Sequence, residues 1–241
     1  MDMTPSTSGR ELEYPEVPPS TRPLSAMENL AIPALYANGE AVYRRHDPVE
    51  YWYRIVAGAA RKSALTADGD RHIVDFLLPG DLFGFGARGV RPFCVEAIVP
   101  GTLIARYPRR DVEDLADSDP RIARGIREAA FDSIARLQRR MLILSRTSAL
   151  ERVAAFLLEM ADRGPGELCQ IVFLPMSRYD IADYLGMAVV TVSRALTELR
   201  TRRVIALRGV RRVSICDRPA LEELVDRLTR WAGCKEDHHV R

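Results

Sequence analysis

The residues of this sequence that are equipped for chemistry gather in its last third, and most of them are arginines. Residues 176–212 hold eight arginines against Asp180, Asp183 and Glu198, a formal charge of +5 in a chain whose net charge is +2. The arginines are Arg178, Arg194, Arg200, Arg202, Arg203, Arg208, Arg211 and Arg212. Such a run can face the phosphates of a nucleic acid or form an ordinary solvated surface, and charge alone does not separate the two.

One segment of this run has the pattern of a helix that reads DNA. In residues 189–200 the apolar positions Val192, Leu196 and Leu199 fall on one side of a helix. Arg194 can donate to guanine O6 and N7 together, and in the alternative it only pairs with Glu198, worth about 0.3–0.5 kcal/mol. We favour base contact. The candidate reading residues are Val189, Val190, Thr191, Ser193 and Arg194.

Turn signals around this helix indicate a winged helix-turn-helix. Ser177 can cap a helix over residues 179–185, with Asp180 as the reciprocal capping partner, and Gly186 supplies the turn. Arg178 and Arg211 are expected to contact phosphates, and Ser177 is a further candidate DNA-binding residue. The remaining predicted elements are a helix at 149–163, a strand at 171–174, a hairpin at 204–207 and 212–215, and a last helix at 218–231.

A long amphipathic helix precedes this domain. It is expected to start at Asp119-Pro120, and its apolar stripe is typical of either a coiled-coil seam or ordinary core packing. We favour the seam, which predicts a homodimer through Ile126, Ala130, Ile134, Leu137, Met141 and Leu144. The opposite side, with Arg124, Arg127, Glu128, Asp132, Arg136 and Arg139, is expected to face solvent.

Short β-rich pieces separated by glycine turns fill residues 35–107 and predict an antiparallel barrel or jelly roll. The proline-rich start favours an extended, mobile arm. We divide the chain into an arm at 1–34, a β domain at 35–110, a dimerisation helix at 111–147, a winged helix-turn-helix at 148–232 and a tail at 233–241. The fold class is α+β.

Other chemistries find little support in the sequence. Cys94, Cys169, Cys216 and Cys234 form no CxxC pair, and we identify no nucleophile–base grouping, phosphate-binding glycine loop or HExxH motif. We therefore expect neither an enzyme nor a metal or other cofactor. The apolar runs are far shorter than the roughly 20 residues of a membrane helix, and residues 1–13 lack an export signal. We expect a cytoplasmic protein with no membrane partner.

Two motifs, which follow one another in the order expected for the family, resemble the Crp/Fnr superfamily and are closest to its FixK branch. Residues 174–186 and 191–196 resemble its DNA-binding domain, and residues 76–84, Phe-Leu-Leu-Pro-Gly-Asp-Leu-Phe-Gly, resemble its cyclic-nucleotide-binding β-roll. The resemblance covers about residues 35–230. It implies a homodimeric transcription regulator, an activator that binds a DNA palindrome, recruits RNA polymerase and controls genes for oxygen-limited respiration, denitrification or nitrogen fixation. A ligand-responsive regulator or sensor module is the alternative.

The departures from the family pattern narrow these expectations. Members that bind cyclic AMP carry a Gly-Glu pair and a later Arg-Ser or Arg-Thr pair, whereas this sequence has Gly84-Phe85 and Arg91-Pro92, so cyclic AMP binding is not expected. The N-terminal cysteine cluster of iron–sulfur members is missing, and His46 and His72 are read as structural rather than haem ligands. Val190 stands where relatives carry a base-reading glutamate, which predicts an altered TTGA-type half-site.

Overall fold

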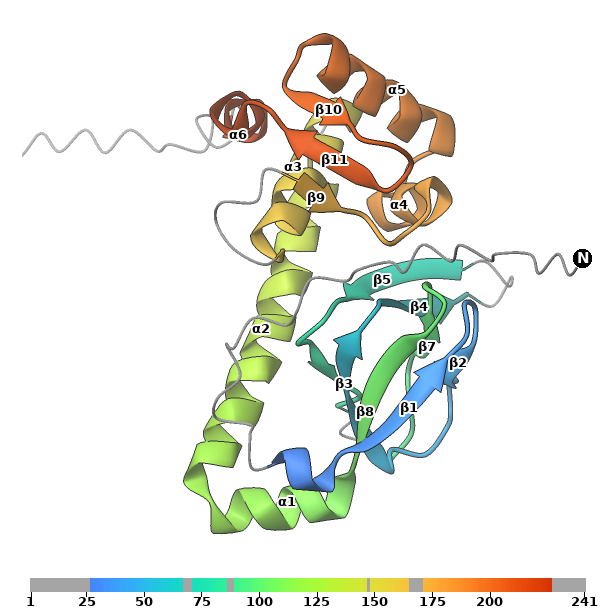
Figure 1. The fold of residues 1–241 in the computed structure, drawn as a ribbon, viewed down its shortest axis with the longest axis vertical. Helices are drawn as coiled ribbons and strands as arrows, with labels where there is room; N and C mark the ends of the chain where they lie inside the picture. The colour runs from blue at the N-terminus through green and yellow to red at the C-terminus, as the bar shows by residue number, and fades with distance from the viewer. Residues whose placement is uncertain (1–26, 67–70, 86–88, 147, 165–170, 227–241) are drawn as a thin grey trace, which may run out of the picture.

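The computed structural model describes residues 27–66, 71–85, 89–146, 148–164 and 171–226, and Figure 1 shows their arrangement. A β-roll and a C-terminal helical domain lie at the side and the end of one long helix. The predicted α+β architecture is confirmed. The predicted boundary of the arm at residue 34 lies too far along the chain. Met27 is buried, and strand β1 (Ile32–Tyr36) already belongs to the β-roll.

The β-roll consists of two antiparallel sheets packed face to face. Within the described residues one sheet has the strand order β1, β8, β3, β6 and the other β2, β7, β4, β5. Tyr53, Ile55, Val95 and Ile104 are buried between them. The further strands are β2 (Ala41–Tyr43), β3 (Tyr51–Ala57), β4 (Ala60–Leu65), β5 (Arg71–Leu77), β6 (Leu82–Phe83), β7 (Cys94–Ala97) and β8 (Thr102–Pro108).

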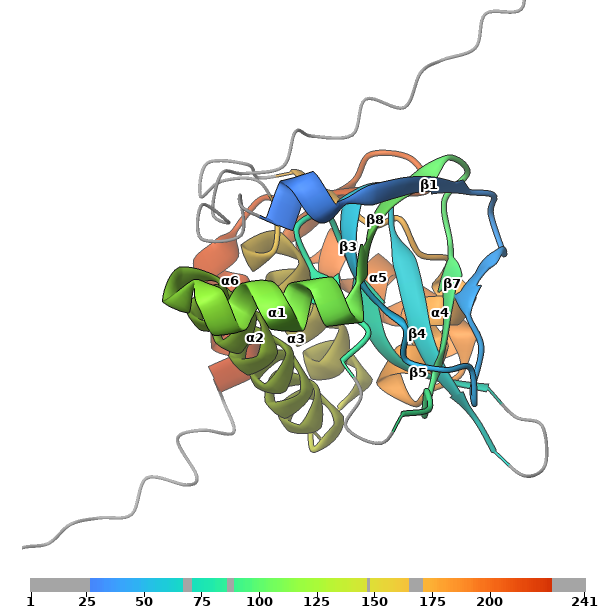
Figure 2. The same ribbon diagram turned by 90° about the horizontal axis from the view of Figure 1, so that it is seen from below.

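The predicted dimerisation region contains two helices, α1 (Arg109–Ser118) and α2 (Pro120–Leu144). Asp119 between them is extended, with φ −125° and ψ 104°, because a following proline disfavours helical backbone. Its carboxylate caps α2 by accepting from the Arg121 amide, so the predicted helix start is confirmed. Seen from below, α1, α2 and α3 (Ala149–Asp162) gather beside the strands (Figure 2).

The C-terminal domain has the predicted winged helix-turn-helix order. Ser177 and Asp180 form the predicted capping box at the start of α4 (Arg178–Leu185), and Gly186 ends that helix with φ 62°, a left-handed conformation that suits glycine. Helix α5 (Val189–Thr201) follows. The remaining elements are β9 (Ile171–Phe173), β10 (Ile205–Leu207), β11 (Arg212–Ile215) and α6 (Arg218–Asp226), while predicted helical residues 227–231 lie outside the described chain.

The expectation that Arg136 faces solvent is wrong. Its side chain is buried and contacts Asp75 of β5 at 3.2 Å and Asp81 at 3.3 Å. Arg163, which caps the C-terminus of α3, binds the same Asp81 at 2.6 Å. Two carboxylates of the β-roll therefore hold α2 and the C-terminal domain together, a long-range pairing that helical periodicity does not reveal. We call Asp75, Asp81, Arg136 and Arg163 the junction cluster.

Candidate DNA-binding interface

Helix α5 presents the face that the sequence predicts. Val192, Leu196 and Leu199 are buried, whereas Ser193 and Arg194 are exposed. Val190 is also exposed, at 55% of its surface, and Val189 and Thr191 are half-buried. More than half of the Val190 surface is open to solvent at the start of α5, so that part is available for apolar contact such as with a thymine methyl.

Arg194 does not form the ion pair with Glu198 that was the alternative to base contact. Glu198 instead pairs with Arg202 one turn further along. Within the described part of the chain no ion pair to Arg194 is found, so its guanidinium projects from α5 ready to bind an acceptor. Ser193 donates its hydroxyl to the Val189 carbonyl at 3.0 Å, which leaves its oxygen as an acceptor.

At the start of α4, Ser177 and Arg178 are more constrained than Arg194. Ser177 is exposed, but its hydroxyl donates to the Asp180 carboxylate at 2.7 Å. Arg178 is half-buried, its Nη1 has no hydrogen-bond partner, and burial lowers the pKa of its guanidinium. Arg178 is thus the first residue of α4, with part of its guanidinium turned away from solvent.

The hairpin of β10 and β11 forms the wing. Gly209 turns with φ 91° between Arg208 and Val210, and Val210 is exposed. Arg211 is half-buried, and its carbonyl accepts from the Leu174 amide at 2.8 Å, which ties the wing to the segment before α4. Arg212 beside it is exposed.

An ionic contact that sequence reasoning missed fixes α4 against the β-roll. Asp180, which is almost fully buried, binds Arg61 of β4 at 2.8 Å and Arg71 of β5 at 3.3 Å. Asp183 accepts from the Ile73 amide at 3.1 Å. The capping motif identified Asp180, but nothing local in the sequence points to partners more than 100 positions away. Figure 1 shows the consequence: α4 rests on β5, and α5 lies beyond it, away from the β-roll.

Helix α2 carries an apolar surface without a partner in the described chain. Ile134, Leu137 and Met141 are exposed, Met141 at 71% of its surface, and Ala130 is half-buried. Two residues that the seam prediction omits, Phe131 and Leu142, extend this surface. The predicted seam residues Ile126 and Leu144 are half-buried within the subunit, and Ile126 packs against the buried cluster around Tyr107.

The three positions on which the cyclic AMP expectation depends are Phe85, Arg91 and Pro92. The Phe85 ring packs edge-on against Trp52 at a centroid distance of 5.3 Å, and Pro92 is exposed at the surface. Arg91 is buried and donates to two backbone carbonyls. No group of three or more His, Cys, Asp or Glu side chains suited to a metal occurs among the described residues.

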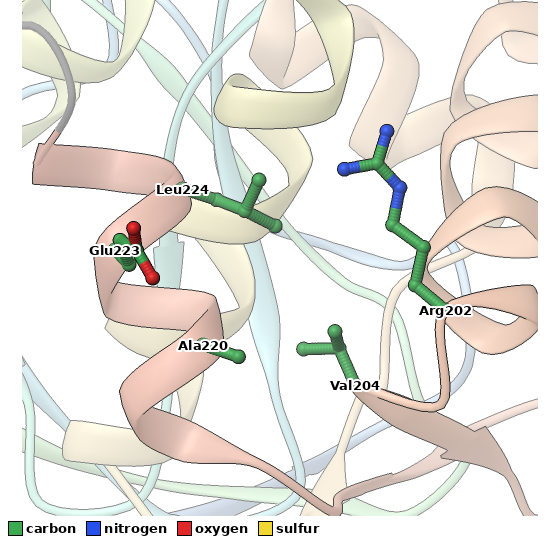
Figure 3. Close-up of a pocket in the computed structure, with 5 residues that line it drawn as sticks. All are labelled: Arg202, Val204, Ala220, Glu223 and Leu224. Carbon is green, nitrogen blue, oxygen red and sulfur yellow. The ribbon is translucent and has the colours of Figure 1, made fainter.

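A shallow hollow of about 160 Å³ lies between α6 and the end of α5 (Figure 3). Val204, Ala220 and Leu224 form its apolar part, and Arg202 and Glu223 line its edges. Ligand pockets usually measure roughly 300–1,000 Å³, so this hollow is too small for a nucleotide. The exposed face of α5, rather than this hollow, is the candidate functional site.

Comparison with known sequences agrees with this geometry. Residues 34–119 match the cyclic nucleotide-binding domain and residues 151–224 the Crp-like helix-turn-helix domain. A β-roll, a long helix and an outward-facing recognition helix define a Crp-type DNA-binding regulator.

Individual relatives specify the branch. The chain is 39% identical over 191 residues to the nitrogen fixation regulation protein FixK of Rhizobium meliloti (strain 1021), covering 79% of this chain and 86% of that protein. It is 30% identical over 200 residues to the transcriptional activator protein FnrL of Cereibacter sphaeroides, covering 80% of each. The solved structure of FixK2 from Bradyrhizobium japonicum matches with a TM-score of 0.74 and 38% identity over 80% of this chain and 96% of that one. The chain belongs to the FixK/Fnr-type transcription regulators of the Crp/Fnr superfamily.

No helix in the described portion of the chain is long and apolar enough to cross a membrane.

Proposed function

We propose that this protein is a cytoplasmic homodimer that activates genes for oxygen-limited respiration, denitrification or nitrogen fixation by binding a palindrome and recruiting RNA polymerase. Its half-sites are of the TTGA type, altered at the base pair that faces Val190. It acts without enzymatic chemistry, without a cofactor and without cyclic AMP. The name of the FixK relative supports control of nitrogen-fixation genes, and the name of the FnrL relative supports activation.

The observation that carries the DNA-reading part is the exposed face of α5. Arg194 has neither the Glu198 pair nor another ion-pair partner among the described residues, and an exposed, unpaired arginine near the start of a recognition helix is suited to guanine. Val190 offers only apolar contact, which favours a thymine methyl. Arg208, Arg211 and Arg212 in the wing add positive charge for the flanking phosphates.

The homodimer is supported by the apolar surface of α2. Ile134, Leu137 and Met141 lie at the spacing of a coiled-coil seam and are exposed to solvent in one copy of the chain. A second copy packed on this seam would bury them. Two α5 helices related by a two-fold axis would then meet successive major grooves about 34–36 Å apart.

Selection of bound DNA from a random pool by the purified, ligand-free protein tests the proposal. We expect an enriched palindrome with a guanine in each half-site and half-sites one helical turn apart. Enrichment of no sequence, or enrichment only after cyclic AMP is added, would contradict it. Repeating the selection at several salt concentrations separates sequence reading from phosphate attraction, because only the phosphate contribution falls steeply with salt.

A further inference from the structure

The interior of the β-roll contains the guanidinium of Arg91. Backbone carbonyls and aromatic rings, rather than a carboxylate, surround this guanidinium. Arg91 is 2% exposed. Its Nη1 donates to the Gly84 carbonyl at 2.7 Å and its Nη2 to the Tyr51 carbonyl at 2.6 Å. Its guanidinium carbon lies 4.1 Å from the ring centre of Tyr43 and 5.1 Å from that of Tyr53. Among the described residues it makes no ion pair with a carboxylate.

The surrounding backbone is shaped to this side chain. Gly84 has φ +90°, and a Cβ there would lie 2.9 Å from Arg91 Nη1 and 2.8 Å from the Tyr53 ring. Only glycine suits that position, because both the left-handed backbone and the close approach exclude a larger residue. Tyr53 also stacks on Phe83 at 5.3 Å, so the ring that faces the guanidinium is itself held in place.

A short segment links this guanidinium to the junction between the domains. Gly84, which accepts from Arg91, lies three positions after Asp81. In the junction cluster Asp81 forms ion pairs with Arg136 of α2 and with Arg163, the C-cap of α3. Residues 81–84 therefore have the buried arginine at one end and the ion pairs to both helices at the other.

We propose that Arg91 is an internal cation that takes the place of a bound ligand in the β-roll. Its guanidinium holds residues 81–84 in place, and these hold the junction cluster in the arrangement that directs α5 outward. The guanidinium lies against Tyr43 and Tyr53 and already donates to two carbonyls, so it is not free to pair with the phosphate of a nucleotide. Removing the guanidinium opens a site that accepts a small planar cation. The DNA readout of this inference rests on the proposed function.

Chemical rescue of Arg91→Ala by methylguanidinium tests the inference. In full-length protein we expect Arg91→Ala to lower the midpoint of thermal unfolding by about 4 °C or more and operator affinity by about tenfold. Millimolar methylguanidinium should raise both again in a saturable manner, because a ligand that binds only the folded state stabilises it. Methylammonium, which lacks the planar fork, should not.

Two further variants serve as controls. Arg54 also lies over an aromatic ring, 5.9 Å from the Tyr107 centre, but it pairs with the surface residue Glu28, so Arg54→Ala should gain nothing from methylguanidinium. Arg91→Lys, which keeps the charge without the fork, should bind the operator more weakly than wild type.

The outcomes distinguish the inference from the proposed function. Unchanged stability and operator affinity in Arg91→Ala, or a loss that methylguanidinium restores equally in Arg54→Ala, would overturn the role of Arg91. If Arg91→Ala cannot be purified folded, failure of Arg91→Lys to weaken operator binding overturns it instead. Wild-type protein that binds no selected DNA would contradict the proposed function, while the thermal rescue would still decide the role of Arg91.

Discussion

Replacing Arg136 with methionine removes one cation from the junction cluster and leaves a buried carboxylate poorly paired. Asp75 is 4% exposed, and without Arg136 its nearest cationic partner in the cluster is Arg163 Nη1 at 3.9 Å. Asp81 keeps its contact with Arg163 at 2.6 Å and loses less. Breaking a buried pair from one side costs about 3–5 kcal/mol. Because Arg163 remains, we expect the lower end, about 3 kcal/mol of unfolding free energy.

The loss should depend on pH in a defined direction. Burial raises the pKa of Asp75 above its usual value, and Arg136 and Arg163 oppose that rise. A raised folded-state pKa means that the native protein binds the proton more tightly than the unfolded chain, so stability falls as pH rises between the unfolded and folded values. Arg136→Met removes an opposing charge and raises the pKa of Asp75 further. The variant should therefore be less impaired at about pH 5 than at about pH 7.5.

Urea unfolding of wild type, Arg136→Met and the double variant Asp75→Asn/Arg136→Met measures these effects. The double variant should recover much of the loss, because it removes the uncompensated charge. A loss below about 1 kcal/mol in Arg136→Met, or an equal loss at both pH values, would refute this account of the junction cluster.

Three further predictions concern assembly, ligand response and the α4 contact. Ile134→Glu/Leu137→Glu should give monomers in sedimentation and weaken operator binding by at least about tenfold, whereas Arg124→Glu on the other side of α2 should stay dimeric; a dimeric double variant would show that α2 is not the interface. Cyclic AMP or cyclic GMP should leave operator affinity unchanged, because Phe85 packs on Trp52 and the Arg91 guanidinium already donates to two backbone carbonyls. Calorimetric binding in the micromolar range would overturn this. Arg71→Glu places a negative charge beside Asp180 and Asp183 and should lower unfolding free energy by about 1 kcal/mol and speed hydrogen exchange at the Ile73 amide; unchanged exchange would show that α4 docks without these charges.

Short-range sequence signals predicted the helix-turn-helix of α4 and α5 well. The Ser177–Asp180 capping box, Gly186 in the turn and the buried positions of α5 each depend on residues a few positions apart, and the structure confirms all of them. The strands of the β-roll were predicted for the same reason, since glycine turns separate them. Most of β1 was assigned to the arm because Pro33 lies within it.

Contacts between distant segments were not predictable from the sequence. Arg136 fits a solvated helical face by periodicity, yet its partner Asp75 lies 61 positions away and buries it. Arg61 and Arg71 give no local hint that they bind α4. Phe131 is exposed on α2 but was not among the predicted seam residues, because the apolar periodicity was assigned to other positions. Pairing across the domain junction depends on the assembled fold, which composition and periodicity do not specify.

Whether α5 reads DNA sequence through Arg194 is tested most directly by a binding series. The series covers all single-base variants of the selected half-site at one salt concentration. Wild type, Arg194→Ala, Val190→Glu and Arg211→Ala are compared. Arg194→Ala should cost about 1–3 kcal/mol on the best site and relax preference mainly at one base pair. Val190→Glu adds a carboxylate acceptor and should favour a base with an exocyclic amine at the neighbouring position.

Arg211→Ala is the matched control, because a lost phosphate contact weakens binding to every sequence about equally and reduces the salt slope by about one unit. We predict that Arg194→Ala changes the base preference and that Arg211→Ala does not. If Arg194→Ala lowers affinity uniformly and leaves the preference at every base pair intact, Arg194 anchors the DNA backbone and α5 does not read sequence through it.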